Sequence, residues 1–346
     1  MLASLAADRA ALADFQAKIL DLQSESTVQE RLDSYRYPVL TLPNEVVSEI
    51  FMRFIPAYPK WPPLRGLGSP ITLTHICRKW RQTALATPTL WRALELKDGF
   101  DERAIWLDRA GSLPVSLVID IAEESPSAAL EVSKAFAFIL PYCERWEYLF
   151  CRIHDGRALP VMEYQLPLLR GLQLEFTVEQ DFVVGDAPLL RTAVLDYNAP
   201  KHVILPWARL TKLTLYCVTR DEAMPLLQSA PNLVYLVLSL YPDSKESADT
   251  RVLQDLTMPS LTTLVVNTGD RGLTTYVLPR FRAPALRVLD IYERLLGPNP
   301  IDSLTSFITK SGCNLRHLHL YTSRPESDST YRIAFPSITK IVLTSV

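Results

Sequence analysis

The stretch "LRVLDI", Leu286–Ile291, has large aliphatic residues at its first, fourth and sixth positions. In an extended strand the fourth and sixth side chains point to one face, and the residue between them points to the other. The pattern recurs along the second half of the chain, with first positions at Leu169, Leu190, Leu210, Leu233, Leu261, Leu286, Leu315 and Ile338. Neighbouring copies lie about 24 residues apart on average, so the chain contains an internal repeat with one strand per copy.

This spacing is typical of leucine-rich repeats, whose period is roughly 20–29 residues. Each such repeat contributes a strand and a return helix and buries its leucines against the next repeat. We interpret "PVSLVIDI" from Pro114 and "WEYLFC" from Trp146 as degenerate earlier copies. The sequence therefore predicts an α/β leucine-rich-repeat solenoid over 98–346, with clear repeats from about 166.

Proline precedes most of the copies at a fixed position. It lies two residues before the first apolar residue in six of them, at Pro167, Pro188, Pro231, Pro259, Pro284 and Pro336. We expect proline there to fix an extended approach to the strand and to stop the preceding helix.

Residues 1–36 are rich in alanine and leucine. Leu5, Leu12 and Ile19 recur every seven residues, while Phe15 and Leu22 form a second row of the same stripe. The pattern predicts an N-terminal amphipathic helix. Because fewer than three clean heptads are present, we favour a helix that packs on its own chain over a coiled coil between two chains.

Two further apolar stripes lie between residues 37 and 97. In "LPNEVVSEIF" from Leu42, Asn44 is placed to cap a helix. The apolar face of that helix would consist of Val46, Val47, Ile50, Phe51 and Phe54. A proline-rich insertion at about 56–70 must then form a loop. The second stripe, "LTHICRKWRQTA" from Leu73, predicts another helix with apolar positions Leu73, Ile76, Cys77, Trp80 and Ala84.

These stripes, followed by "TPTLW", resemble an F-box, and the arrangement with an insertion is similar to the F-box-like proteins of mushroom-forming (basidiomycete) fungi. The resemblance implies an α+β multidomain protein, with a small all-α F-box-like domain over 37–97 ahead of the solenoid. It also implies that this domain binds a Skp-type adaptor and, through the adaptor, a cullin. The residues that it implies as domain core or adaptor contacts, with the two roles left undivided, are Leu42, Pro43, Ile50, Phe51, Cys77, Trp80, Leu90 and Trp91.

An F-box followed by leucine-rich repeats resembles the substrate-recognition subunit of a Skp/cullin/F-box ubiquitin ligase, which binds a protein target for ubiquitination and is not itself an enzyme. The alternative is a leucine-rich-repeat protein-interaction scaffold with no ubiquitin ligase role. The target would bind residues that alternate with the buried leucines, because large side chains with a polar end favour recognition. The candidates are Tyr216, Asp290, Tyr292, His317, His319 and Tyr321. Strand propensity alone could also have placed tyrosine at these positions.

The composition excludes several other classes of function. Lys plus Arg total 36 against 38 Asp plus Glu, so the whole chain lacks the charge excess expected of nucleic-acid or anionic-membrane binding. The five cysteines are odd in number and form no C-x-x-C, which favours a reducing compartment. With no signal-peptide pattern and no long apolar run, we expect a cytoplasmic or nuclear protein.

The sequence also lacks motifs that would carry a cofactor. No phosphate-binding loop, nucleophile elbow or H-E-x-x-H occurs, so no cofactor is expected. His317 and His319 could form half of a metal site, but no third ligand is near them in the sequence. We interpret them as solvated histidines and expect no metal.

Overall fold

The computed structural model describes residues 2–36, 38–96, 100–121, 128–153, 165–177, 181–241, 255–268, 278–322 and 328–345. The chain forms two compact units. The first consists of Met1–Ala57 and Pro62–Trp91, and the second of Tyr58–Trp61 and Arg92–Val346. The F-box-like domain was expected to end at residue 97, whereas the boundary between the two units follows Trp91.

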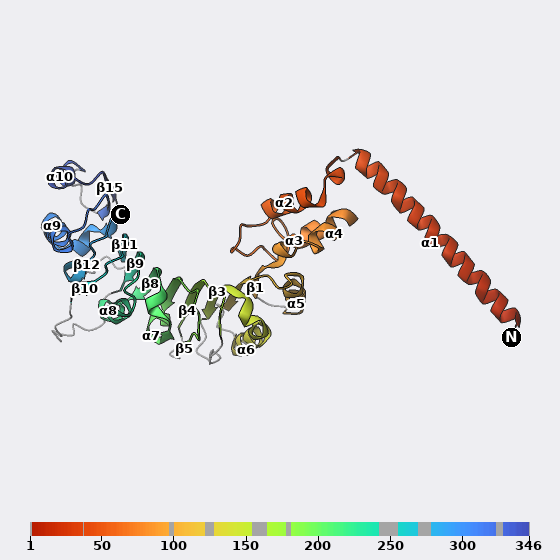
Figure 1. Cartoon of the computed structure of the whole chain (residues 1–346), viewed down its shortest axis with the longest axis horizontal. Coiled ribbons are helices and arrows are strands. Elements are labelled where there is room, and N and C mark those ends of the chain that lie inside the picture. The colour runs from red at the N-terminus through yellow and green to blue at the C-terminus, as the bar shows by residue number, and fades with distance from the viewer. Residues whose placement is uncertain are drawn as a thin grey trace. The chain divides into compact units, whose positions relative to one another are not determined.

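The first unit is helical. Its elements are α1 (Leu2–Arg36), the 3-10 helix η1 (Pro38–Thr41), α2 (Asn44–Phe54), α3 (Pro70–Thr74), α4 (Arg78–Leu85) and η2 (Pro88–Trp91) (Figure 1). No helix or strand forms over residues 56–69, where prolines and glycines dominate the sequence.

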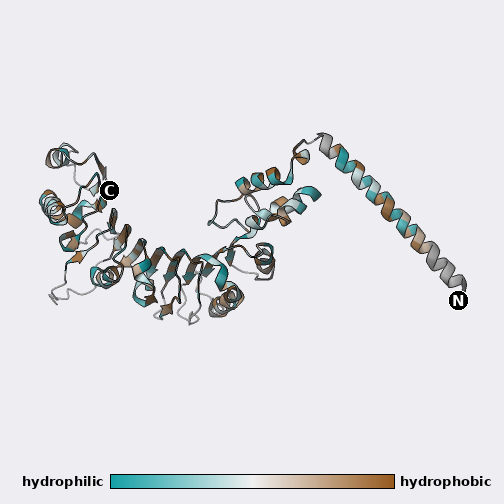
Figure 2. Ribbon diagram, viewed as in Figure 1, coloured by the Kyte–Doolittle hydropathy of each residue, from teal (hydrophilic) through white to brown (hydrophobic). Residues whose placement is uncertain are grey.

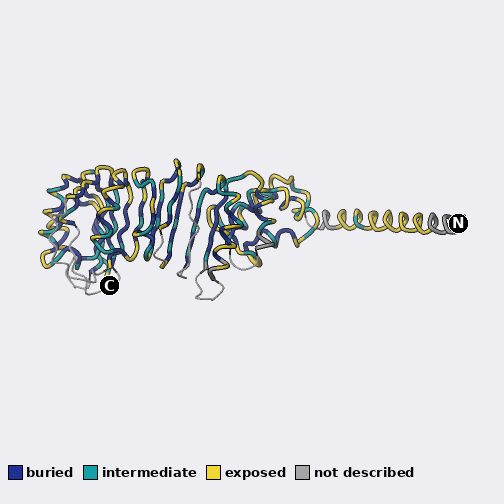
Figure 3. The backbone as a smooth tube through the Cα atoms, turned by 90° about the horizontal axis from the view of Figure 1, so that it is seen from below, coloured by how far each residue is buried: buried dark blue, intermediate teal, exposed yellow. Residues whose placement is uncertain are grey.

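Helix α1 differs from the expected packed helix. From residue 11 to residue 32, every residue except Ser26 is exposed (Figure 3). Leu12, Phe15, Ile19 and Leu22 of the predicted stripe are all more than half exposed. The apolar residues of this stretch therefore face solvent along the helix (Figure 2), and the expected packing on the same chain is absent over 11–32.

The single helix predicted from Leu73 is in fact two short helices. Ser69 caps α3, with Pro70 in the first turn, and its hydroxyl accepts a hydrogen bond from the amide of Ile71. Cys77 is extended and its thiol accepts a hydrogen bond from the amide of Trp80, which makes it the N-cap of α4. The apolar spacing alone predicts one continuous helix, but the N-cap at Cys77 begins a new one.

The second unit contains an 11-stranded parallel sheet, so the chain has a mixed α/β fold with a large parallel sheet. Neighbouring strands follow chain order, and each of the eight predicted strands begins two residues after its first apolar position. Three earlier strands precede them, of which the first was not predicted. The strands are β1 (Ala93–Leu96), β2 (Val115–Ile121), β3 (Trp146–Ile153), β4 (Gly171–Phe176), β6 (Thr192–Tyr197), β8 (Lys212–Val218), β9 (Tyr235–Leu240), β11 (Thr263–Thr268), β13 (Val288–Tyr292), β14 (His317–Thr322) and β15 (Lys340–Ser345).

The remaining elements of this unit connect successive strands. Helices pack on one side of the large sheet, where the repeat leucines are buried, and leave the other face open (Figure 1). No helix of the described residues is long and apolar enough to cross a membrane. The connecting elements are α5 (Phe100–Arg109), α6 (Ala128–Ile139), η3 (Leu140–Arg145), β5 (Phe182–Val183), α7 (Ala199–His202), β7 (Val203–Ile204), η4 (Trp207–Arg209), α8 (Arg220–Ser229), β10 (Leu256–Thr257), η5 (Leu278–Arg280), β12 (Phe281–Arg282), η6 (Glu293–Leu296), α9 (Pro300–Ser311) and α10 (Asp328–Ala334).

The prolines before the strands lie in tight turns rather than in extended approaches. At Pro188, for example, the amide of Leu190 donates to the carbonyl of Ala187, and the same i to i+3 bond spans Pro284. Proline is favoured at the second position of such a turn because its φ is already set. The prediction of an extended approach was therefore wrong.

The open face of the sheet is defined by residues that alternate with the buried ones. Strand register aligns one residue from each of nine strands into a single row across this face. The row consists of Phe150, Gln173, Val194, Thr214, Val237, Val265, Asp290, His319 and Val342.

Candidate functional site

Helix α2 has apolar residues on two sides. Val47 and Phe51, one turn apart, are buried at 1% and 0% exposure. Val46 and Ile50, also one turn apart, are 44% and 42% exposed. Because residues four apart lie on the same side of a helix, α2 contributes one apolar side to the core and presents another to solvent.

The core of the helical unit contains three of the eight residues implied by the resemblance. Phe51 packs edge-on against Trp80, with ring centroids 5.0 Å apart. Leu90 and Trp91 are buried, and the Trp91 indole donates a hydrogen bond of 2.9 Å to the carbonyl of Ala84. Phe51, Leu90 and Trp91 therefore hold the unit together, while Cys77 caps α4.

The exposed residues lie at the start of α2. We name Leu42, Pro43, Val46 and Ile50 the helical apolar surface; Leu42 is half-buried and the other three are exposed. Lys79 Nζ donates to the carbonyls of Leu40 and Leu42, at 2.6 and 2.9 Å, and so ties the segment before α2 to α4. Sequence reasoning placed Val46 on the apolar face of α2 but did not choose it as a site residue.

Part of the proline-rich insertion packs on the open face of the sheet. We name Tyr58–Trp61 the insertion strap. The Tyr58 ring lies edge-on to Tyr148, with centroids 5.7 Å apart, and Trp61 lies 6.1 Å from Phe150. Ser116 Oγ donates a hydrogen bond of 2.8 Å to the carbonyl of Pro59. The strap therefore covers the open face at β2 and β3.

A glycine on the neighbouring strand makes room for this packing. A Cβ at Gly171 would lie 2.8 Å from Cδ1 of Tyr148, closer than carbon atoms approach in proteins. The Tyr148 ring therefore lies over β4 as well as under Tyr58. Only a residue without a side chain allows that position.

Glu147 connects the strap to two arginines of the sheet. Its carboxylate accepts hydrogen bonds from Tyr58 Oη at 2.8 Å, Arg92 Nη2 at 3.0 Å and Arg170 Nε at 3.1 Å. The Arg92 guanidinium also lies 3.5 Å from the centroid of the Tyr58 ring. Burial, together with the hydrogen bond to Glu147, raises the pKa of Tyr58 well above its ordinary value, although Arg92 acts in the opposite direction. Tyr58 therefore stays protonated and donates to Glu147.

At the other end of the sheet, the structure brings together four of the six predicted target-binding residues. We name Asp290, Tyr292, His319 and Tyr321 the C-terminal cluster. Tyr292 stacks on Tyr321 with centroids 4.9 Å apart, and His319 lies 4.4 Å from Tyr321. Burial raises the pKa of the Tyr321 hydroxyl, with Asp290 and Tyr292 adding to the effect, so the hydroxyl remains protonated at neutral pH.

His319 is held from both sides of its ring. Nδ1 lies 3.3 Å from Asp290 Oδ2, and Nε2 lies 2.7 Å from Thr344 Oγ1. Both nitrogens are therefore engaged within the sheet. The described residues contain no group of three potential metal ligands around it.

The other two predicted residues lie outside the C-terminal cluster. His317 is on β14 but belongs to the next row of the open face, beside Val288 and Lys340. Tyr216 is on β8, separated from β13 by β9 and β11. The register between β8 and β9 shifts after Leu215, and Cys217 has a positive φ of 52°, so Tyr216 does not continue the rows of its neighbours.

Sequence reasoning missed two residues that support this cluster. Glu293 is only 5% exposed, and its carboxylate accepts hydrogen bonds from the hydroxyls of Thr322 and Tyr331. The Arg294 guanidinium carbon lies over the Tyr292 ring, 4.5 Å from its centroid, in a cation–π contact. Arg294 also donates a hydrogen bond to the carbonyl of Thr268. Their position directly after β13, where the repeat ends, is the signal that could have drawn attention to them.

Comparisons with known proteins add no family assignment. No protein-family model matches the chain, and no curated protein matches it significantly.

Proposed function

We propose that this protein is the substrate-recognition subunit of a Skp/cullin/F-box ubiquitin ligase, acting in the cytoplasm or nucleus. In this proposal residues 37–97 form an F-box-like domain that binds the Skp-type adaptor. The sheet and its connecting helices form a leucine-rich-repeat solenoid that binds the protein target. The observation that carries the proposal is the two-sided α2, which has Val46 and Ile50 exposed beside the buried Val47 and Phe51.

The helical apolar surface supports adaptor binding. Exposed apolar residues that are adjacent on a helix mark interaction sites when they form a patch, and burying such a patch in a complex is favourable. Burial of a Val or Ile side chain contributes about 1.5–3 kcal/mol. The helical unit already has its own core, so these side chains are available to a partner.

The open face supports target binding in the same proposal. The insertion strap occupies the open face at β2 and β3, which leaves β6 to β15 for a target. The receptor would transfer nothing itself. It would hold the target near a charged ubiquitin-conjugating enzyme, so that a bimolecular transfer becomes effectively intramolecular.

The test is co-purification of the full chain with a Skp-type adaptor. We expect V46D/I50D to abolish binding, because two carboxylates cannot be buried in an apolar interface without a partner. The matched control is Leu67→Asp, which changes a residue of the same unit that is 89% exposed and lies in the insertion. Binding that survives V46D/I50D would contradict the proposal. Adaptor binding without recruitment of a cullin would instead indicate the interaction scaffold.

A further inference from the structure

Arginine occurs at the same position in four of the repeats, directly after the first leucine and immediately before the strand. These residues are Arg170, Arg191, Arg287 and Arg316. Two of them are satisfied within the chain. Arg170 pairs with Glu147, and Arg191 Nη1 donates to the carbonyls of Pro188 and Leu190.

Arg287 and Arg316 have no such partner. Both are exposed, and neither forms an ion pair or side-chain hydrogen bond with the residues that the structure describes. They lie immediately before the neighbouring strands β13 and β14, because the amide of Arg316 donates to the carbonyl of Arg287 and Val288 pairs with His317. Two like charges side by side where adjacent strands begin are destabilising unless an anion compensates them.

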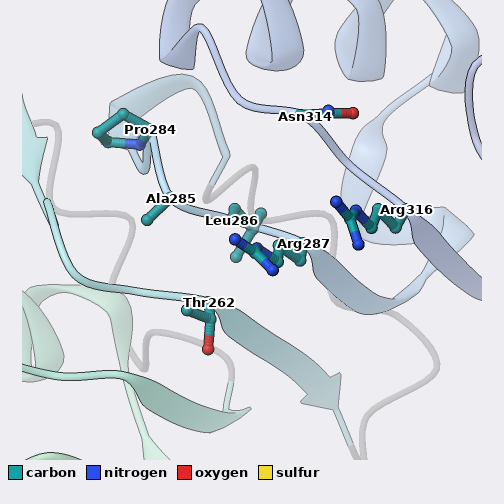
Figure 4. Close-up of a pocket in the computed structure, with 7 residues that line it drawn as sticks. All are labelled: Thr262, Pro284, Ala285, Leu286, Arg287, Asn314 and Arg316. Carbon is teal, nitrogen blue, oxygen red and sulfur yellow. The ribbon is translucent and has the colours of Figure 1, made fainter.

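The two arginines line a hollow of about 190 Å³ at the edge where the strands begin. Figure 4 shows their side chains next to each other, with Thr262 and Asn314 on either side. A water molecule occupies about 30 Å³ of liquid, so the hollow can hold a group much larger than one water. Guanidinium forks favour carboxylate and phosphate oxygens, and they remain charged at any physiological pH.

We propose that Arg287 and Arg316 form an oxyanion-binding site for an acidic segment of the bound target, through a carboxylate or phosphate group. This inference rests on the proposed function, because the anion is supplied by the protein target that the sheet is proposed to bind. At the N-terminal end of the sheet an arginine at the same repeat position already has an anionic partner within the chain: Glu147 on β3 accepts a hydrogen bond from Arg170, the residue immediately before β4. Thr262 takes the equivalent place beside Arg287, since the amide of Arg287 donates to the Thr262 carbonyl as that of Arg170 donates to the Glu147 carbonyl.

This equivalence provides an internal test. In Thr262→Glu the new carboxylate would pair with Arg287 and occupy the site from within the chain, as Glu147 does for Arg170. The matched control is Thr262→Gln, which has the same size without the charge. The direct variant is R287A/R316A. Its control is R191A/K212A, which removes the same charge at the start of two other neighbouring strands, β6 and β8.

The measurement is fluorescence anisotropy of three labelled peptides with the purified full chain. The peptides are identical except for a central phosphoserine, glutamate pair or serine. We expect at least one acidic peptide to bind the wild type, T262Q and R191A/K212A about equally, and the serine peptide to bind much more weakly. R287A/R316A and T262E should each lower the affinity at least tenfold. The phosphoserine and glutamate peptides distinguish which oxyanion the site prefers.

Equal affinity in wild type and R287A/R316A, equal affinity in T262E and T262Q, or no binding of either acidic peptide to the wild type would overturn the inference. Adaptor co-purification is measured independently of these peptides. If adaptor binding holds and peptide binding fails, only this site is wrong. If peptide binding follows the arginines but no adaptor binds, the proposed ligase role is wrong.

Discussion

The two ends of the parallel sheet are built from the same kind of repeated strand, but the residues on their open faces differ. At β2 and β3 the insertion strap covers the face, and the Glu147 carboxylate accepts hydrogen bonds from both Arg92 and Arg170. At β13 and β14 the insertion strap does not cover the C-terminal cluster. Arg287 and Arg316 have no carboxylate partner among the described residues. One repeat position therefore holds a satisfied cation at one end and unsatisfied cations at the other.

The difference follows from what the repeat requires. Each copy must bury its leucines against the next, so the inward positions are similar in every strand. The open-face positions need not be apolar for the repeats to pack, so their side chains can contribute either to stability or to recognition. We therefore expect substitutions at the N-terminal end to lower the free energy of unfolding, and substitutions at the C-terminal end to lower binding.

The largest effect is expected for Glu147→Ala. This substitution leaves the Tyr58 hydroxyl and the largely buried Arg92 without an acceptor, and we expect it to lower the free energy of unfolding by about 2–3 kcal/mol. Arg170 is 53% exposed and should contribute little to the loss. Urea unfolding followed by circular dichroism measures the change.

The control for Glu147 is Asp290→Ala at the opposite end. Asp290 has one side-chain partner among the described residues, His319. We therefore expect the substitution to lower the free energy of unfolding by less than about 1 kcal/mol. Equal losses for the two substitutions would contradict the division between a folding end and a binding end.

The second effect concerns target binding by the stacked tyrosines. Y292A/Y321A removes both rings of the stack and should lower target affinity about tenfold, or about 1.4 kcal/mol, because large aromatic side chains dominate recognition surfaces. The measurement is the amount of target protein labelled by proximity labelling in cells. The labelling chain carries V46D/I50D, so it retains the sheet but lacks the helical apolar surface. The matched control is Y235A/Y241A, which removes two exposed tyrosines outside the C-terminal cluster. A labelling profile that Y292A/Y321A leaves unchanged would remove this cluster from the target site.

The strands of the second unit could be predicted from the sequence because their buried positions obey a simple alternation. Every predicted repeat segment contributes a parallel strand, and the degenerate segments from Pro114 and Trp146 overlap strands β2 and β3. The first strand, β1, was missed because "ALEL" is short and carries no complete repeat pattern. The break between α3 and α4 was missed because a capping thiol at Cys77 outweighed helical spacing.

The site could be predicted only where neighbouring strands share a register. Asp290, Tyr292, His319 and Tyr321 come together because they occupy aligned positions of β13 and β14. The strap could not be predicted in this way, since prolines identify a loop but do not show what it contacts. Tyr58 meets Glu147 across 89 residues of sequence, and no local pattern encodes that pairing.

The smallest effect is expected for Tyr58→Phe. The substitution keeps the ring beneath Arg92 but removes the hydrogen bond to Glu147, which should lower the free energy of unfolding by about 1 kcal/mol at neutral pH. Because the pKa of Tyr58 is raised in the folded protein, its stabilisation is complete below the unfolded tyrosine pKa of about 10 and is lost as the pH rises toward the folded value. Phenylalanine cannot ionise, so the stability advantage of the wild type over Y58F should narrow between about pH 9 and pH 11. Urea unfolding of both proteins across that interval tests the strap contact, and a difference that stays constant would mean that Tyr58 is as solvated in the folded chain as in the unfolded one.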